Sequence, residues 1–135
     1  MPYPNPTDFK TDMHRARNLG SAKSGVHHWW LVKVTSIALV PLTLWFMWSV
    51  LTYVVPFGGT FDVVLNWVKK PYTSFPLVLL IWVNFYHAAV GGEEIIMDYV
   101  HERKFQIPVL IAYKFLCYAV AAFGIFTVLY ITFRM

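Results

Sequence analysis

Charged side chains are scarce in this chain. They make up 13% of the 135 residues, whereas hydrophobic residues make up 58%. A soluble domain of this length exposes much of its surface, so it could not bury that much apolar material. The net charge of +4 comes without a long basic run or an RNA-binding motif, which argues against nucleic acid as a partner. The composition therefore predicts one small domain with lipid as its solvent.

Cysteine is almost absent. Cys117 is the single cysteine and lies in an apolar run. A disulfide within the chain is thereby excluded, and so is a Cys-x-x-Cys-His motif for covalent haem attachment. We expect no cleavable signal peptide, because the first apolar run begins near residue 29 and is longer than a signal sequence allows.

Three long apolar runs cover about residues 31–55, 75–97 and 107–133. Each holds about 20 or more residues, enough for a helix to cross a hydrocarbon core about 30 Å thick. Helices are required there because a backbone in lipid must satisfy its own hydrogen bonds. We therefore predict an all-α membrane protein with an N-terminal segment at residues 1–28 and three transmembrane helices within a membrane domain at residues 29–133. The first 25 residues are polar and are expected to be extended.

Basic residues are distributed unevenly over the two sides of this membrane domain. Three crossings place the N-terminus and the loop at residues 98–106 on one side, which carries seven basic residues against three on the other. The positive-inside rule then predicts a cytoplasmic N-terminus and a periplasmic C-terminus. Lys114 lies about two turns into the third span and is expected to extend back to the cytoplasmic edge.

The connection between the first two spans, residues 56–74, is predicted to contain a short helix. Gly58 and Gly59 indicate a turn, and Thr60 is a candidate cap for a helix that ends at Trp67. The apolar side chains of this helix fall on one side of it: Phe61, Val64, Leu65 and Val68. We expect it to lie in the membrane interface on the outer surface.

Polar residues form a stripe along the second span. At helical spacing they share one face, whereas Gly92 and Glu93 point elsewhere; the stripe consists of Asn84, His87, Gly91, Glu94 and Asp98. Ionisable residues inside a membrane usually face a bundle interior and mark a cofactor, ion or substrate path. The stripe is therefore the first candidate for a functional site.

His87 has two interpretations. It is either a helix-packing histidine bonded to a neighbouring hydroxyl, or an axial ligand of haem iron, a common role of imidazole. Gly91 follows one turn later and would leave the groove that a porphyrin needs, although glycine also serves simple close packing of helices. A six-coordinate b-type haem takes two ligands, and the other four histidines lie in the tail or near the surface. If His87 binds haem, we expect the second ligand and the rest of the bundle to come from a partner chain.

Asp98 and Tyr99 lie where the second span leaves the bilayer. They fit an ordinary solvated helix end with an interfacial tyrosine, and they equally fit a quinone pocket. A quinone carbonyl needs a hydrogen-bond donor, which the Tyr99 hydroxyl provides, and the Asp98 carboxylate can orient a basic partner or supply protons.

Polar residues also gather before the first span. Trp29 and Trp30 are expected to anchor the chain in the interface. His27 and Lys33, about a turn and a half apart, are candidates for contact with haem propionates, and Lys23 is at least as well suited to phospholipid headgroups.

Two motifs in register resemble the hydrophobic membrane anchor of succinate dehydrogenase, the smaller D type. The pattern His-x3-Gly-x6-Asp-Tyr is present as His87, Gly91, Asp98 and Tyr99, and Ser-Gly-x-His as Ser24, Gly25, Val26 and His27, followed by the basic Lys33. The resemblance covers nearly the whole chain and is greatest to α-proteobacterial and mitochondria-related members. It implies a multi-pass protein of the bacterial cytoplasmic membrane.

The resemblance also implies roles for these residues. His87 would be an axial ligand of haem b, Tyr99 would bind ubiquinone with Asp98 beside it, and His27 and Lys33 would lie near the haem and quinone edge. Relatives often carry arginine at the position of Lys33, so a bidentate propionate contact is weakened. The implied partners are a second, C-type anchor subunit, an iron–sulfur subunit and a flavoprotein.

The leading hypothesis is thus an anchor subunit, not catalytic alone, of a complex that passes electrons from succinate to ubiquinone. One alternative is a fumarate reductase anchor that works in the reverse direction. Another is a small transporter or assembly protein in which His87, Glu93 and Glu94 form a proton path.

Overall fold

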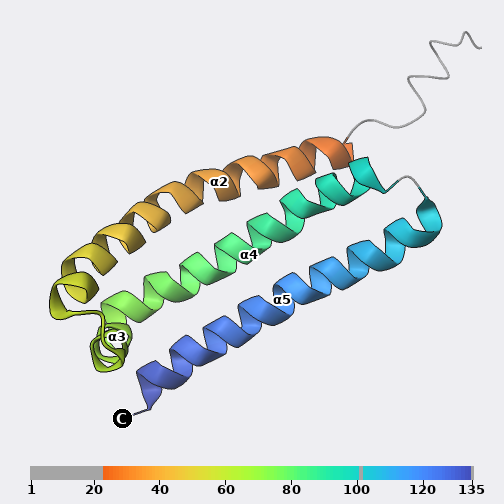
Figure 1. Ribbon diagram of the computed structural model, residues 1–135. Helices are drawn as coiled ribbons and strands as arrows, with labels where there is room; N and C mark the ends of the chain where they lie inside the picture. Colours follow the sequence, from red (N-terminus) through yellow and green to blue (C-terminus); the bar gives the residue numbers. More distant parts are fainter. Residues whose placement is uncertain (1–22, 101, 135) are drawn as a thin grey trace, which may run out of the picture. The chain divides into compact units, whose positions relative to one another are not determined.

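The structure is a computed structural model that describes residues 23–100 and 102–134. All regular elements in these two ranges are helices (Figure 1). They are α2 (Lys23–Ser49), a π-helical turn η2 (Val50–Val54), a 3-10 turn η3 (Val55–Phe57), α3 (Phe61–Val68), α4 (Pro71–Tyr99) and α5 (Arg103–Phe133). The prediction of an all-α chain is confirmed.

Three of these helices are long and apolar enough to cross a membrane: Val26–Phe57, Pro71–Tyr99 and Lys104–Phe133. The three predicted spans lie inside them, so the prediction of three transmembrane helices is confirmed. The helices are longer than the apolar runs. A helix of 29 residues, such as α4, is about 44 Å long. That length exceeds the hydrocarbon core, so its polar ends reach the headgroup region.

The chain divides into two compact units, and the division falls within α2, between Trp30 and Leu31. In the first unit, the structure describes residues 23–30, where the exposed rings of Trp29 and Trp30 meet edge to face with centroids 5.9 Å apart. The expected extended segment lies largely outside the described residues, as does His14. Its described part, residues 23–25, is helical and not extended, because α2 already begins at Lys23. His101, counted above among the surface histidines, also lies outside them.

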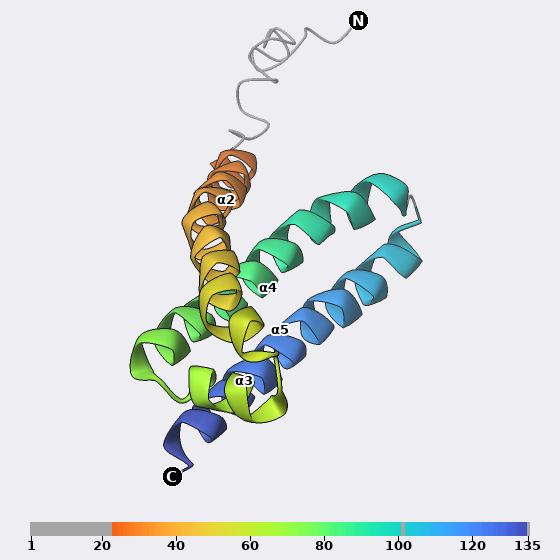
Figure 2. The ribbon, with the colours of Figure 1, turned by 60° about the vertical axis from the view of Figure 1, so that its left-hand side comes forward.

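The second unit is built on the pairing of α4 and α5, which run side by side (Figures 1 and 2). Small side chains are buried in this pair, namely Ala89 of α4 and Cys117 and Ala121 of α5, and Ala89 and Ala121 are each only 1% exposed. Small residues let two helix backbones approach closely, which is a common way for helices to associate in lipid.

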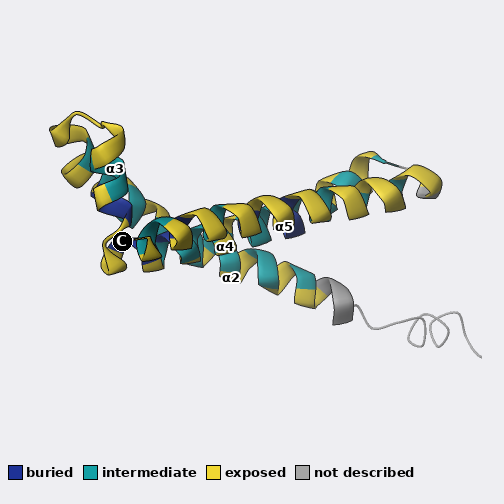
Figure 3. Ribbon diagram, turned by 90° about the horizontal axis from the view of Figure 1, so that it is seen from below, coloured by how far each residue is buried: buried dark blue, intermediate teal, exposed yellow. Residues whose placement is uncertain are grey.

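Large apolar side chains cover much of the outer surface of these helices. Ile37 of α2 is 70% exposed, and Phe115 and Phe123 of α5 are 74% and 73% exposed. Exposed residues accordingly dominate the helices in Figure 3. In water such a surface would be a liability, whereas lipid or a partner helix solvates it.

The turn before α3 depends on two glycines. Gly58 and Gly59 have φ of 81° and 60°, the left-handed region that glycine enters without the penalty of a Cβ. Their amide N–H groups donate to the carbonyls of Val55 and Val54, each at 3.1 Å, and so end the first span. The predicted turn at these positions is therefore present. Thr60 occupies the cap position in extended conformation, but its side chain makes no capping hydrogen bond.

The C-terminal half of α3 is buried against the other helices, and its predicted place in the membrane interface stays a prediction. Trp67 and Val68 are each 7% exposed and pack in one cluster with Leu77 of α4 and Val128 of α5. The Trp67 indole N–H donates to Ser49 Oγ at 2.8 Å and so joins α3 to the end of α2. Phe61, at the other end of α3, is 75% exposed. The predicted apolar side is therefore split: its C-terminal part closes the ends of α4 and α5, and Phe61 stays at the surface.

Candidate functional site

His87 lies half-buried on α4, and its imidazole is tied to α2. The Nδ1 atom is 2.8 Å from Oγ1 of Thr35, which lies 52 residues earlier in the chain. In the described part of the chain, this is the hydrogen bond that the imidazole makes. His87 is therefore bonded to a neighbouring hydroxyl through Nδ1, as the first interpretation predicts. This hydrogen bond does not involve Nε2, so it does not exclude a ligand at that atom.

The surroundings of the Thr35 hydroxyl decide which atom donates in this hydrogen bond. Oγ1 is also 2.7 Å from the carbonyl oxygen of Leu31 and 3.0 Å from that of Val32. A hydroxyl has one hydrogen, and carbonyl oxygens can only accept, so that hydrogen is directed to the carbonyls. Oγ1 then offers a lone pair to His87, and Nδ1–H donates to it. This tautomer leaves an unprotonated Nε2, which is the form of imidazole that ligates a metal.

Gly91 and Gly92 play different parts, although they are adjacent. A Cβ built on Gly91 would meet none of the described residues within 4 Å, so they leave open the face of α4 one turn after His87. A Cβ built on Gly92 would collide with the Oη, Cζ and Cε1 atoms of Tyr113. Within the described residues, close helix packing therefore explains Gly92. The open space beside Gly91 is what a flat ligand bound to His87 would need.

The residues that point away from the stripe hold α4 to α5. Glu93 Oε2 forms an ion pair with Lys114 Nζ at 2.7 Å. The Glu93 side chain is 16% exposed and that of Lys114 is 35% exposed. One position earlier on α5, the Tyr113 hydroxyl donates to the Ala88 carbonyl oxygen at 2.8 Å. The sequence correctly directed Gly92 and Glu93 away from the stripe, but it did not identify these partners on α5. The pairing gives Lys114 a specific acceptor on the neighbouring helix, and its extension to the cytoplasmic edge stays a prediction.

The rest of the stripe is exposed. Asn84, Glu94 and Asp98 all lie on the surface of the unit, and Tyr99, the last residue of α4, is 81% exposed. Lys33 on α2 is exposed, and His27, in the first unit, is exposed as well. The structure thus combines His87 with the open position at Gly91, and it places Asp98 and Tyr99 together in the last turn of α4.

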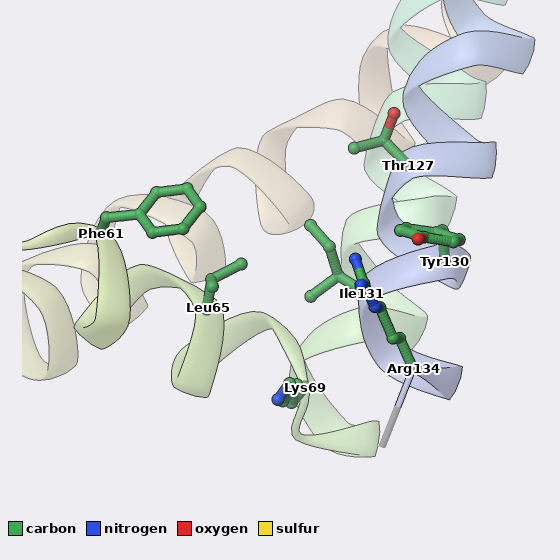
Figure 4. Close-up of a pocket in the computed structure, with 7 residues that line it drawn as sticks. All are labelled: Phe61, Leu65, Lys69, Thr127, Tyr130, Ile131 and Arg134. Atoms are coloured by element: carbon green, nitrogen blue, oxygen red, sulfur yellow. The ribbon is translucent and has the colours of Figure 1, made fainter.

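Metal-binding side chains do not cluster within residues 23–100 and 102–134: no group of three or more His, Cys, Asp or Glu residues is close enough there to hold an ion. A pocket of about 520 Å³ lies at the other end of α4 and α5 from Tyr99, with Lys69 and Arg134 at its rim (Figure 4). It contains none of the predicted site residues. Its lining consists of Phe61, Leu65, Lys69, Thr127, Tyr130, Ile131 and Arg134.

These features define an all-α, multi-pass membrane protein with a half-buried histidine beside an open helix face. The model of the succinate dehydrogenase/fumarate reductase transmembrane subunit family matches residues 7–130, and the chain belongs to this family. The predicted resemblance is confirmed. No solved structure matches the chain.

Named relatives agree with this assignment. The succinate dehydrogenase hydrophobic membrane anchor subunit of Rickettsia conorii (strain ATCC VR-613 / Malish 7) is 33% identical over 111 residues, which cover 82% of this chain and 86% of that protein. The protein of the same name from Rickettsia bellii (strain RML369-C) is 34% identical over 107 residues, 79% of this chain and 83% of that protein. The succinate dehydrogenase membrane anchor subunit of Reclinomonas americana is 36% identical over 89 residues, 63% of this chain and 71% of that protein.

The expected similarity to α-proteobacterial and mitochondria-related members is thereby confirmed. Family membership and the three apolar helices also confirm the predicted location, a multi-pass protein of the bacterial inner membrane.

Proposed function

We propose that the chain is the hydrophobic membrane anchor subunit of a succinate:ubiquinone oxidoreductase, and that His87 supplies one of two axial ligands to a shared haem b. Family membership and the names of the relatives support the anchor role. The observation that carries the haem assignment is the state of the His87 ring, whose Nδ1 is engaged by Thr35 and whose Nε2 is left for a ligand.

The residues present fit a haem on two counts. In a neutral His87 whose Nδ1–H is donated to Thr35, Nε2 carries the lone pair that serves as a standard axial ligand of haem iron. Gly91 leaves open space on the same face of α4, where any side chain would project a Cβ. Haem b, when bound, supplies a one-electron redox centre beside the electron-transfer route. His87 would hold the iron, and α2 and α4 would provide part of the wall that excludes water.

A partner chain completes this site in the proposal. The described residues offer one deep histidine, so the second axial ligand would come from the second, C-type anchor subunit. The exposed stripe residues Asn84, Glu94 and Asp98 and the exposed apolar side chains of α2 and α5 are then the surfaces available to that subunit and to lipid. Lys33 is assigned to the propionate edge of the haem, where an ammonium serves as a point charge. The role of His27 at that edge stays a prediction from the sequence.

The quinone site is assigned to the end of α4. Tyr99 would donate its hydroxyl hydrogen to a ubiquinone carbonyl, and Asp98 would orient a basic neighbour or relay protons as the quinone is reduced. The exposure of both side chains at the last turn of α4, where the helix leaves the membrane, fits a site that a partner subunit closes.

The orientation follows from charge. With the N-terminus and the α4–α5 loop in the cytoplasm, the side carrying seven basic residues faces inward. The flavoprotein and iron–sulfur subunits would dock on that side, next to the proposed quinone site. Residues 1–28 would form the cytoplasmic segment in this arrangement.

The alternatives differ in what they require. A fumarate reductase anchor would use the same site with electrons flowing in the reverse direction, and the family includes both types. A proton-path protein would require Glu93 to exchange protons, but Glu93 is paired with Lys114 at 2.7 Å. The Glu93 carboxylate is thus already engaged in holding α4 to α5. This ion pair favours the anchor proposal over the proton path.

Purification of the native complex tests the proposal. We expect the chain to co-purify from membranes with a flavoprotein, an iron–sulfur protein and a second small membrane subunit, and the preparation to contain haem b and reduce ubiquinone with succinate. A chain that purifies without a flavoprotein would contradict the anchor role. Faster quinol:fumarate than succinate:ubiquinone turnover would support the fumarate reductase alternative.

A further inference from the structure

Thr35 is the residue through which α2 reaches the proposed haem ligand. Its hydroxyl oxygen lies 2.8 Å from His87 Nδ1 and within 3.0 Å of two carbonyl oxygens of its own helix. We propose that Thr35 is a positioning residue for His87: it accepts the Nδ1–H hydrogen bond and thereby fixes both the tautomer and the orientation of the ring. The inference rests on the proposed haem site and adds a residue outside the motif that suggested that site.

The mechanism depends on the helical hydrogen bond of Thr35. Because the hydroxyl hydrogen is held by the Leu31 carbonyl at 2.7 Å and the Val32 carbonyl at 3.0 Å, the oxygen presents a lone pair in a fixed direction. The Nδ1–H group of His87 donates into that lone pair. A hydrogen-bond acceptor at the ring nitrogen that does not bind the metal orients a metal-bound imidazole and increases its basicity. Loss of that acceptor typically weakens metal binding about 10- to 100-fold.

Threonines elsewhere in the chain show that the contact is not a general consequence of threonine in these helices. Thr52, Thr127 and Thr132 each donate to the carbonyl four residues earlier, all at 2.8 Å, and none is paired with a histidine in the described part of the chain. Such bonds within a helix are common for threonine. What distinguishes Thr35 is that its second lone pair faces α4.

The next residue provides a matched control. Ser36 is part-buried on the same helix, and its hydroxyl donates to the Val32 carbonyl at 2.8 Å. It makes the helical bond that Thr35 makes, but no bond to His87 is recorded among the described residues. Ser36→Ala therefore removes a hydroxyl from the same turn of α2 and leaves the His87 hydrogen bond intact.

The test uses the intact complex with Thr35→Val, which keeps the shape and removes the acceptor, and Thr35→Ser, which keeps the acceptor. In Thr35→Val, we expect haem to dissociate about tenfold more readily. We also expect the midpoint potential of the haem to rise, because a less basic imidazole stabilises the ferric form less. Thr35→Ser and Ser36→Ala should keep the wild-type potential and haem content. Thr35→Ala, which also removes the acceptor, is measured in parallel, so that the test can still be read if the valine variant assembles poorly.

Two results would overturn the inference: a wild-type potential in both Thr35→Val and Thr35→Ala, or a serine variant that behaves like the valine variant. His87→Ala separates this failure from failure of the proposed function. If His87→Ala loses haem while Thr35→Val keeps the wild-type potential, the positioning role is wrong and the ligand assignment stands. If His87→Ala keeps its haem and its potential, the proposed haem ligand is itself wrong.

Discussion

The contrast between Gly91 and Gly92 gives the sharpest prediction about packing. In Gly92→Ala, the new Cβ would overlap the Tyr113 ring, so the ring must move and its hydroxyl must give up the Ala88 carbonyl. Overpacking of this kind costs about 1–3 kcal/mol, and the lost hydrogen bond costs about 1 kcal/mol more. Replacing glycine by alanine in a helix returns up to about 1 kcal/mol. We expect Gly92→Ala to be destabilised by about 1–3 kcal/mol.

Gly91→Ala is the matched control, because it makes the same chemical change one residue earlier, where nothing lies within 4 Å. Thermal unfolding of the purified complex in detergent and haem content per complex are measured for both variants. Gly92→Ala should lower the unfolding temperature and leave the haem content of the intact complex unchanged. Gly91→Ala should instead lower the haem content, because its methyl group fills the open face beside His87.

A double variant tests whether Tyr113 is the cause. When Tyr113 is replaced by Leu, the obstacle is removed, so the further change Gly92→Ala should cost nothing or stabilise slightly. Tyr113 would not be the obstacle if Gly92→Ala were as stable as the wild type, or if the substitution were equally destabilising with and without the Tyr113 ring.

Two other variants test the ion pair and the quinone assignment. Lys114→Met should destabilise the complex by about 1–3 kcal/mol, because it leaves the mostly buried Glu93 carboxylate without its cation. The double variant with Glu93→Gln should be more stable than Lys114→Met alone, and a lower unfolding temperature of the double variant would contradict this. Tyr99→Phe should raise the KM for ubiquinone about tenfold through loss of one hydrogen bond, while succinate oxidation by an artificial acceptor keeps its rate. Equal losses in both assays would contradict the assignment of Tyr99 to the quinone site. The same effect from the control variant Tyr118→Phe on α5 would contradict it as well.

The fold could be predicted largely from the sequence because lipid imposes a simple rule. Apolar runs long enough to cross the bilayer must be helices, so the three spans followed directly from composition. The ends of the helices could not be placed in the same way. Polar residues such as Thr73, Ser74 and Asp98 extend α4 beyond the apolar run at residues 75–97, since helical hydrogen bonding does not stop where hydropathy falls.

The short connecting helix shows where pattern alone is insufficient. Its start and end were close to the prediction, because the glycine turn and the apolar spacing are local signals. Its burial was not predicted, because Trp67 becomes buried only through contact with Leu77, Val128 and Ser49, which belong to three other helices.

The candidate site likewise contains residues that the sequence identifies and residues that only the packing of the helices identifies. His87 and Gly91 stand out by their spacing on one helix, which a sequence displays directly. Thr35 gave no signal, because it is one hydroxyl in an apolar span and meets His87 only through the packing of α2 against α4. Tyr113 and Lys114 likewise acquired their partners from the pairing of α4 and α5. Contacts between helices determine these roles, and they carry no local pattern.

The most direct test of the proposed haem site is the reduced-minus-oxidised optical spectrum of the purified complex carrying His87→Ala. Ser36→Ala serves as its control, because the Ser36 hydroxyl donates to the Val32 carbonyl of its own helix at 2.8 Å. If His87 is an axial ligand, the b-type haem band of the wild-type complex is lost or shifted to a high-spin form in His87→Ala and kept in Ser36→Ala. An unchanged band and haem content in His87→Ala would contradict the central claim.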